Sequence, residues 1–139
     1  MSRIPFVQRG GPYPFLEVRI VVTRQDTGRR EVFTENCKVD TGFYADIFMP
    51  SHYQLAISQL GVPLYDTPLI LADGKEVSAK ACYAHVEKID DHEFPAPGID
   101  IALFCHGNPK NPLLGLRLLN KWIAELDGPR QILSLFSPA

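Results

Sequence analysis

Regular alternation of apolar and polar residues marks the first extended segment of the chain, residues 15–22. Its apolar face consists of Val18, Ile20 and Val22, and its polar face of Glu17 and Arg19. Alternation with a period of two is typical of a strand that buries one face. The polar turn Asp26-Thr27-Gly28 follows, and residues 31–39 are extended again, so the two runs are predicted to form a β-hairpin.

The rest of the chain divides into short extended runs separated by turn-forming residues. Further strands are predicted at residues 43–49, 68–72, 76–89, 99–104, 123–126 and 131–136. Asp73-Gly74 lies between two of them, and Asp-Gly is a strong hairpin signal. One helix is expected between Ser51, its N-cap, and Gly61, its stop, and a second over residues 116–122. The pattern predicts an all-β, mainly antiparallel domain with a short helix mid-chain and another near the C-terminus.

Length and composition indicate one globular domain. The chain has 139 residues, of which 45% are hydrophobic and 22% are charged, as in ordinary proteins that bury a core. Residues 1–14 contain the pair Gly10-Gly11 and are predicted to form an N-terminal arm or a strand at the edge of a dimer. The domain itself is expected to cover residues 15–139.

Charge and hydropathy narrow the class of partner. The net charge is −2, and the longest basic run is Arg29-Arg30, so a nucleic-acid surface is not expected. No apolar run approaches the roughly 20 residues of a membrane span, and residues 1–5 lack the apolar region of a signal peptide. These features predict a protein without nucleic-acid or membrane partners and, by default, a cytoplasmic location.

The cysteines suggest thiols rather than disulfides or a metal site. The chain has three, Cys37, Cys82 and Cys105, an odd number without framework spacing. A zinc site of Cys82, His85, Cys105 and His106 is conceivable from residue type alone. Neighbouring residues of a strand point to opposite faces, however, so an adjacent Cys-His pair ligates one ion awkwardly. We therefore expect buried thiols, surface imidazoles, and neither a metal nor another cofactor.

The tripeptide Asp-Thr-Gly occurs twice, in different surroundings. Asp26-Thr27-Gly28 lies in a polar segment, where Asp bonding its own backbone and Gly at positive φ are ordinary turn chemistry. Asp40-Thr41-Gly42 is followed instead by an apolar stretch that begins at Phe43. A carboxylate at the entrance to a core is costly unless it has hydrogen-bond partners or a function. The setting of Asp40, rather than the tripeptide, makes it a candidate acid.

A second motif, Leu113-Leu114-Gly115, lies 75 residues after Asp40. Two apolar residues and a glycine form a segment that can pack under a tight loop and hold it rigid. That separation leaves room for several strands between the two motifs.

Together these residues resemble the single-domain, retropepsin-like aspartic proteases and their bacterial relatives. Val39-Asp40-Thr41-Gly42 is similar to the active-site motif of that family, and Leu113-Leu114-Gly115 to its second signature. The hairpin at Ala72-Asp73-Gly74 falls where such proteins carry the flap that closes over substrate. The agreement in order and spacing extends over about residues 15–136.

The resemblance implies a fold and an activity. The fold is a closed β-barrel corresponding to half of a pepsin, with a flap hairpin and a short C-terminal helix, working as a C2 homodimer. The activity is hydrolysis of peptide bonds by an aspartic endopeptidase, with one Asp40 from each subunit activating a water. Two carboxylates a few Å apart cannot both ionise readily, so they hold one proton between them. The expected partners are a second copy of the chain and a peptide or protein substrate.

The resemblance also assigns roles to single residues. The catalytic loop would be Asp40, Thr41 and Gly42, with Thr41 bonding across the dimer axis. The substrate would contact Phe43 and the flap residues Ala72, Asp73 and Gly74. Structural support of the loop would come from Leu113, Leu114 and Gly115.

Phe43 is a departure from the family pattern, which favours Ser, Thr or Ala after the tripeptide. A side chain of this size can narrow the cleft, and the flap turn has a single glycine. The alternative function is therefore a catalytically silent domain that binds an extended peptide, or a domain that serves only for dimerisation.

Overall fold

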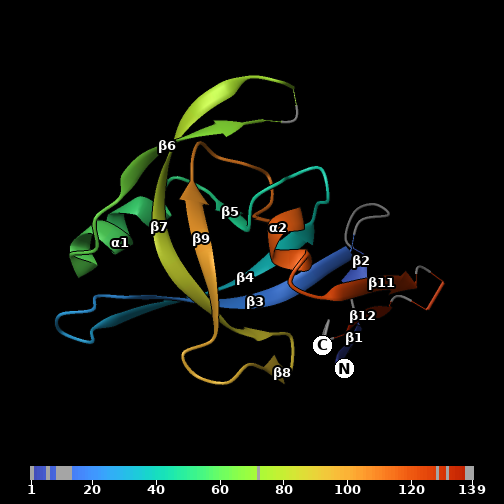
Figure 1. The fold of residues 1–139 in the computed structure, drawn as a ribbon. Coiled ribbons are helices and arrows are strands. Elements are labelled where there is room, and N and C mark those ends of the chain that lie inside the picture. Colours follow the sequence, from blue (N-terminus) through green and yellow to red (C-terminus); the bar gives the residue numbers. More distant parts are fainter. Residues whose placement is uncertain are drawn as a thin grey trace.

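The computed structural model describes residues 2–5, 7–8, 14–71, 73–127, 129–130 and 132–136 (Figure 1). The strands are β1 (Ser2–Pro5), β2 (Val7–Gln8), β3 (Pro14–Thr23), β4 (Arg30–Val39), β5 (Ile47–Met49), β6 (Tyr65–Ile70), β7 (Glu76–Ile89), β8 (His92–Glu93), β9 (Ile99–Cys105), β10 (Leu113–Leu114), β11 (Ile123–Asp127) and β12 (Ile132–Phe136). The helices are α1 (Tyr53–Leu60) and α2 (Leu116–Leu119). The prediction of a mostly β chain with two short helices is confirmed.

The strands form two sheets. The larger has the order β2-β3-β4-β10-β5-β9-β7-β6, with β8 attached to β7 and an additional pairing of β3 with β7. The smaller has the order β1-β12-β11 and lies on the side of α2, away from α1 (Figure 1). Most pairs are antiparallel, as predicted, but β10 runs parallel to β4 and β5 runs parallel to β9. The large sheet is therefore mixed.

Both hairpins that turn chemistry predicts are present. β3 and β4 pair from Phe15 opposite Lys38 to Thr23 opposite Arg30, and Gly28 takes φ +71° in the turn. β6 and β7 pair from Tyr65 opposite Ala81 outward, and this hairpin arches over the rest of the large sheet (Figure 1). Glycine at such positive φ carries none of the steric cost that other residues pay.

The main core lies between the inner faces of the large sheet and α1. It contains fully buried aliphatic side chains from β3, β5, β9 and α2, including Ile20, Ile47, Leu103 and Leu118. α1 contributes Ile57 and Leu60. These contacts fix the framework on which the loop after β4 is carried.

Two local predictions are wrong. Ser51 does not cap α1: the N-cap is His52, without a side-chain cap bond, and Ser51 instead offers its carbonyl to the Gln54 N–H. The strand predicted over residues 43–49 covers only Ile47–Met49, because the backbone carbonyls of Phe43, Ala45 and Asp46 accept hydrogen bonds from another segment, described below. The stop at Gly61, with φ +91°, is as predicted. No helix within the described residues is long and apolar enough to cross a membrane.

Candidate functional site

The loop that carries Asp40 joins β4 to β5, and the short strand β10 lies between those two strands. Leu114 of β10 pairs with Val39 on the parallel side and with Ile47 on the antiparallel side. The Asp40 N–H donates to the carbonyl oxygen of Leu114 at 2.9 Å. A segment 75 residues downstream of Asp40 thus holds both ends of the loop in one sheet.

The Asp40 carboxylate is positioned by the loop's own backbone. Its Oδ1 accepts a hydrogen bond from the Gly42 N–H at 2.9 Å, and the Asp40 carbonyl accepts one from the Phe43 N–H at 3.2 Å. A Cβ on Gly42 would lie 3.1 Å from the same Oδ1, so glycine leaves the carboxylate uncrowded. Asp40 is half-buried, and both Thr41 and Gly42 are exposed. The carboxylate is held in one orientation and is accessible from outside.

The start of α2 fixes the rest of the loop. The N–H groups of Gly115, Leu116 and Arg117 donate to the carbonyls of Asp46, Phe43 and Ala45, at 2.8, 2.7 and 3.3 Å respectively. The first N–H groups of a helix have no partner within the helix, so the loop carbonyls supply the acceptors that these N–H groups need. This exchange of bonds is why residues 43–46 do not continue the strand.

Gly115 is the point of closest approach between the two motifs. A Cβ there would stand 2.6 Å from Phe43 Cδ2, 2.7 Å from the Phe43 carbonyl oxygen, and closer still to the carbonyl oxygen of Ala45. Its φ of −100° is open to any residue, so the requirement for glycine is one of space. Gly115 lets α2 touch the loop.

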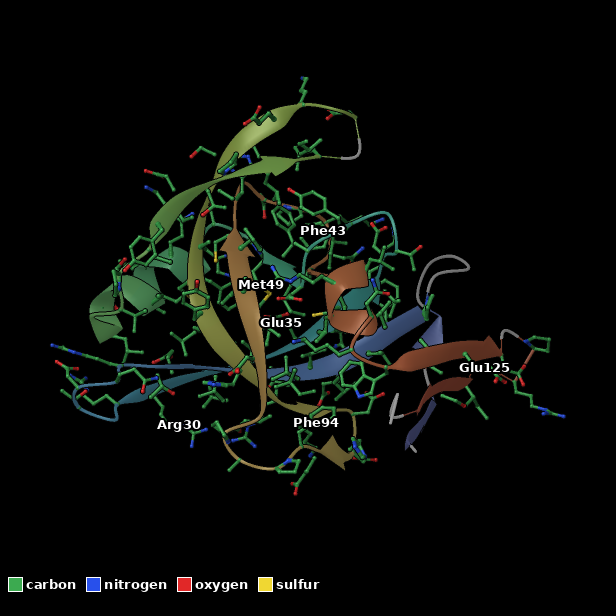
Figure 2. The ribbon with its side chains drawn as sticks, in the orientation of Figure 1. Arg30, Glu35, Phe43, Met49, Phe94 and Glu125 are labelled. Atoms are coloured by element: carbon green, nitrogen blue, oxygen red, sulfur yellow. The ribbon has the colours of Figure 1, made fainter. Side chains whose placement is uncertain are left out.

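The β6–β7 hairpin packs onto the loop through a second apolar cluster. We call this the hairpin cluster: Phe43, Ala45, Phe48, Leu69, Ala79, Ala81 and Phe104. Figure 2 shows Phe43 between α2 and the hairpin. The ring of Phe43 lies 5.7 Å from that of Phe48, and it is 8% exposed. Phe43 therefore fills space beneath the hairpin.

The turn of the hairpin is closed by backbone bonds. The Leu71 N–H donates to the Lys75 carbonyl and the Gly74 N–H to the Leu71 carbonyl, at 2.8 and 2.9 Å. Gly74 has φ +84°, and Asp73 accepts from the Lys75 N–H. Ala72, named with them as a flap residue, lies outside the described residues.

Tyr44 provides a polar contact between the loop and the hairpin that the sequence did not reveal. Its hydroxyl accepts a hydrogen bond from the Ile70 N–H at 3.3 Å. The donor is a backbone group 26 residues away, so no side-chain pattern marks the pair.

Asp46 closes the loop and is 2% exposed. Its Oδ2 accepts from the Ala102 N–H at 2.8 Å, while Oδ1 has no hydrogen-bond partner among the described residues. Arg117 lines the same cavity as Asp46, but no ion pair between them is present among the described side chains. Through its bond to Ala102, Asp46 anchors the loop to β9.

A cavity of about 590 Å³ lies beside Asp46 and is bordered by side chains of β6, β7 and β9. It is lined by Asp46, Tyr65, Thr67, Ala81, Cys82, Tyr83, Asp100, Ile101, Ala102, Phe104, Arg117 and Lys121. Ala81 and Phe104 also belong to the hairpin cluster, so the cavity continues the space beneath the hairpin. Asp40 is not among its lining residues.

The cysteines and His85, the other candidate ligands described here, are buried or paired. All three cysteines are free and buried. Burial raises the pKa of Cys82 to about 11 and that of Cys105 to about 12, and it raises the pKa of Cys37 further. His85 contacts Asp100 at 2.8 Å. Among the described residues, no group of three or more His, Cys, Asp or Glu side chains could hold a metal ion.

Comparison with known proteins identifies a likeness of fold. No protein-family model and no curated protein sequence matches the chain. Among solved structures, it is similar to a retropepsin-like aspartic protease from Rickettsia conorii, with a TM-score of 0.57 and 19% identity, over 95% of this chain and 88% of that one. The chain therefore has a retropepsin-like fold, as the resemblance predicted.

Proposed function

We propose that the protein is a homodimeric aspartic endopeptidase in which each subunit contributes Asp40. The observation that carries the proposal is the fixed carboxylate on a braced loop. The Asp40 N–H donates to Leu114, and the Asp40 Oδ1 accepts from the Gly42 N–H. The far end of the loop is held by hydrogen bonds from the start of α2. The likeness of fold to a retropepsin-like protease supports the same assignment.

The chemistry requires two carboxylates that share one proton. The ionised member draws a proton from a water, which then attacks the scissile carbonyl carbon. The protonated member hydrogen-bonds the carbonyl oxygen as negative charge develops there, and a proton is then delivered to the leaving amine. Each chain offers one such loop, so a C2 dimer is the economical source of the second acid.

Two features of the isolated chain favour assembly. Thr41 and Gly42 form an exposed loop tip, where Thr41 would bond to the partner loop across the two-fold axis. The small sheet ends in β1 on one side and β11 on the other. Within the described part of the chain these outer edges have no partner strand, and unpaired strand edges are ready templates for pairing with another chain.

The test compares the two Asp-Thr-Gly tripeptides. Asp40→Asn should abolish cleavage of a denatured-protein or peptide-library substrate at mildly acid pH, because the amide cannot act as the base. Asp26→Asn is the matched control, because Asp26 lies in a hairpin turn where its carboxylate accepts hydrogen bonds from Arg24. This variant should retain full activity. Equal activity of Asp40→Asn and wild type would refute the proposal, as would a protein that sedimentation shows to be monomeric while it cleaves.

The alternative is a silent peptide-binding domain, favoured by Phe43 packed beneath the hairpin. Under this alternative, wild type and Asp40→Asn would both bind peptides and neither would cleave them. A domain serving only for dimerisation would neither bind nor cleave peptides, and Asp40→Asn would change little. Thermal shift with the peptide inhibitor pepstatin is a rapid first measurement, because it reports binding without turnover.

A further inference from the structure

β6, the outer strand of the hairpin, has few backbone N–H donors along its free edge. β6 is the last strand in the order of the large sheet, so one of its edges has no partner strand among the described residues. Residues of an antiparallel strand direct their backbone groups alternately toward the partner and away from it. Pro68, which has no N–H, pairs with Ser78, and Ile70, two residues later, therefore directs its N–H to the same free side.

That N–H is already engaged by Tyr44. The Tyr44 hydroxyl accepts from the Ile70 N–H at 3.3 Å, and Tyr44 is only four residues from Asp40. Both side chains remain accessible, Tyr44 at 50% and Ile70 at 58% exposure. The bond thus lies on the open side of the hairpin, beside the catalytic loop, where a ligand can reach it.

We propose that the Tyr44 hydroxyl occupies, in the free protein, the backbone donor that an extended peptide takes when it binds under the hairpin. An extended peptide pairing with a strand edge needs main-chain donors, and Pro68 removes the donor next to Ile70 on the free edge. A peptide carbonyl must then displace the phenol oxygen at Ile70. Tyr44 is accordingly a positioning residue that holds the hairpin over the loop until substrate arrives, an inference that rests on the proposed function.

The first test needs no ligand. A neutral hydrogen bond contributes about 0.5–1.5 kcal/mol, so Tyr44→Phe should accelerate exchange of the Ile70 amide hydrogen, measured by NMR, by about two- to tenfold. The Leu71 amide, bonded to Lys75 within the turn, is the internal control and should not change. Tyr53→Phe removes a hydroxyl from α1, where the ring packs on Phe33 of β4, and should leave both amides unaffected. Unchanged exchange at Ile70 in Tyr44→Phe would overturn the inference.

The second test measures binding of pepstatin by calorimetry at mildly acid pH. Tyr44→Phe should bind about two- to tenfold more tightly than wild type, since the peptide no longer competes with the hydroxyl. Tyr53→Phe should bind like wild type. Weaker binding by Tyr44→Phe would overturn the inference, because the hydroxyl would then be a direct ligand contact.

The two tests separate failure of the inference from failure of the proposed function. If Asp40→Asn abolishes cleavage while Tyr44→Phe changes neither exchange nor affinity, the peptidase assignment stands and the inference about Tyr44 falls. If Tyr44→Phe accelerates exchange at Ile70 but no variant binds pepstatin or cleaves peptides, the peptidase assignment falls, and displacement by a peptide falls with it.

Discussion

Substituting Gly115 by Ala should disable the site from a position that touches no substrate. The added Cβ would stand 2.7 Å from the carbonyl oxygen of Phe43, and real Cβ atoms keep at least 3.0 Å from other heavy atoms. The Phe43 carbonyl must therefore retreat by at least 0.3 Å, and that of Ala45 by more. Backbone atoms, unlike the end of a flexible side chain, can move only if the whole loop moves.

The cost of Gly115→Ala follows from what that movement breaks. Overpacking a filled site costs about 1–3 kcal/mol. Two hydrogen bonds, from Gly115 to Asp46 and from Leu116 to Phe43, would also be lost. Each loss costs about 1 kcal/mol of stability. We expect the free energy of unfolding to fall by about 3–5 kcal/mol. That is a large part of the roughly 5–15 kcal/mol that holds a domain of this size folded.

Urea denaturation and a cleavage assay test this expectation together. Gly28→Ala is the control, because Gly28 has positive φ but nothing within 4 Å of an added Cβ. It should lose about 1–2 kcal/mol through backbone strain and keep its activity. Gly115→Ala should lose activity even at temperatures where it remains folded. If Gly115→Ala cleaves normally and unfolds within about 0.5 kcal/mol of wild type, α2 does not brace the loop.

Three further outcomes are expected. Burial raises the pKa of Asp90, so its ionisation costs stability as the pH rises past its folded-state pKa. Asp90→Asn should therefore raise the Tm at pH 7, and this gain should vanish below about pH 4, where the wild-type carboxyl is protonated; a constant gain would contradict the assignment. Phe43→Ala should cost about 3 kcal/mol in urea denaturation, while Leu55→Ala, at an exposed position of α1, should change stability little; equal effects would mean that the hairpin cluster is not packed. Iodoacetamide should leave all three thiols unmodified in the native protein and alkylate them in urea, because burial raises their pKa; rapid native labelling would show the core to be open.

Local chemistry made much of the fold predictable. The two hairpins follow from Asp-Gly and Asp-Thr-Gly turns between extended runs, and the stop of α1 follows from Gly61. In these cases the residues that determine the conformation lie within a few positions of one another. β7, predicted over residues 76–89, has those bounds in the structure.

Errors arose where distant segments compete for the same backbone groups. The strand predicted from residue 43 begins only at Ile47, because α2 takes the carbonyls of Phe43, Ala45 and Asp46. The bond between Tyr44 and Ile70 was missed for a similar reason, since its donor belongs to the main chain. A sequence pattern shows which residues are apolar or form turns, but it does not show which backbone groups remain available.

The two Asp-Thr-Gly tripeptides show how context separates a turn from a candidate active site. In the first, the Asp26 carboxylate is exposed and bonded to the side chain of Arg24, which lowers its pKa. In the second, the Asp40 carboxylate accepts from the Gly42 N–H, and its loop is held by β10. The tripeptide is the same, so the difference comes from Leu113-Leu114-Gly115 lying between β4 and β5. An acid that must keep one orientation through a reaction needs such long-range support. Leu113-Leu114-Gly115 is therefore a better indicator of function than the tripeptide. Substitutions at Gly115 test directly whether this support is needed at the site.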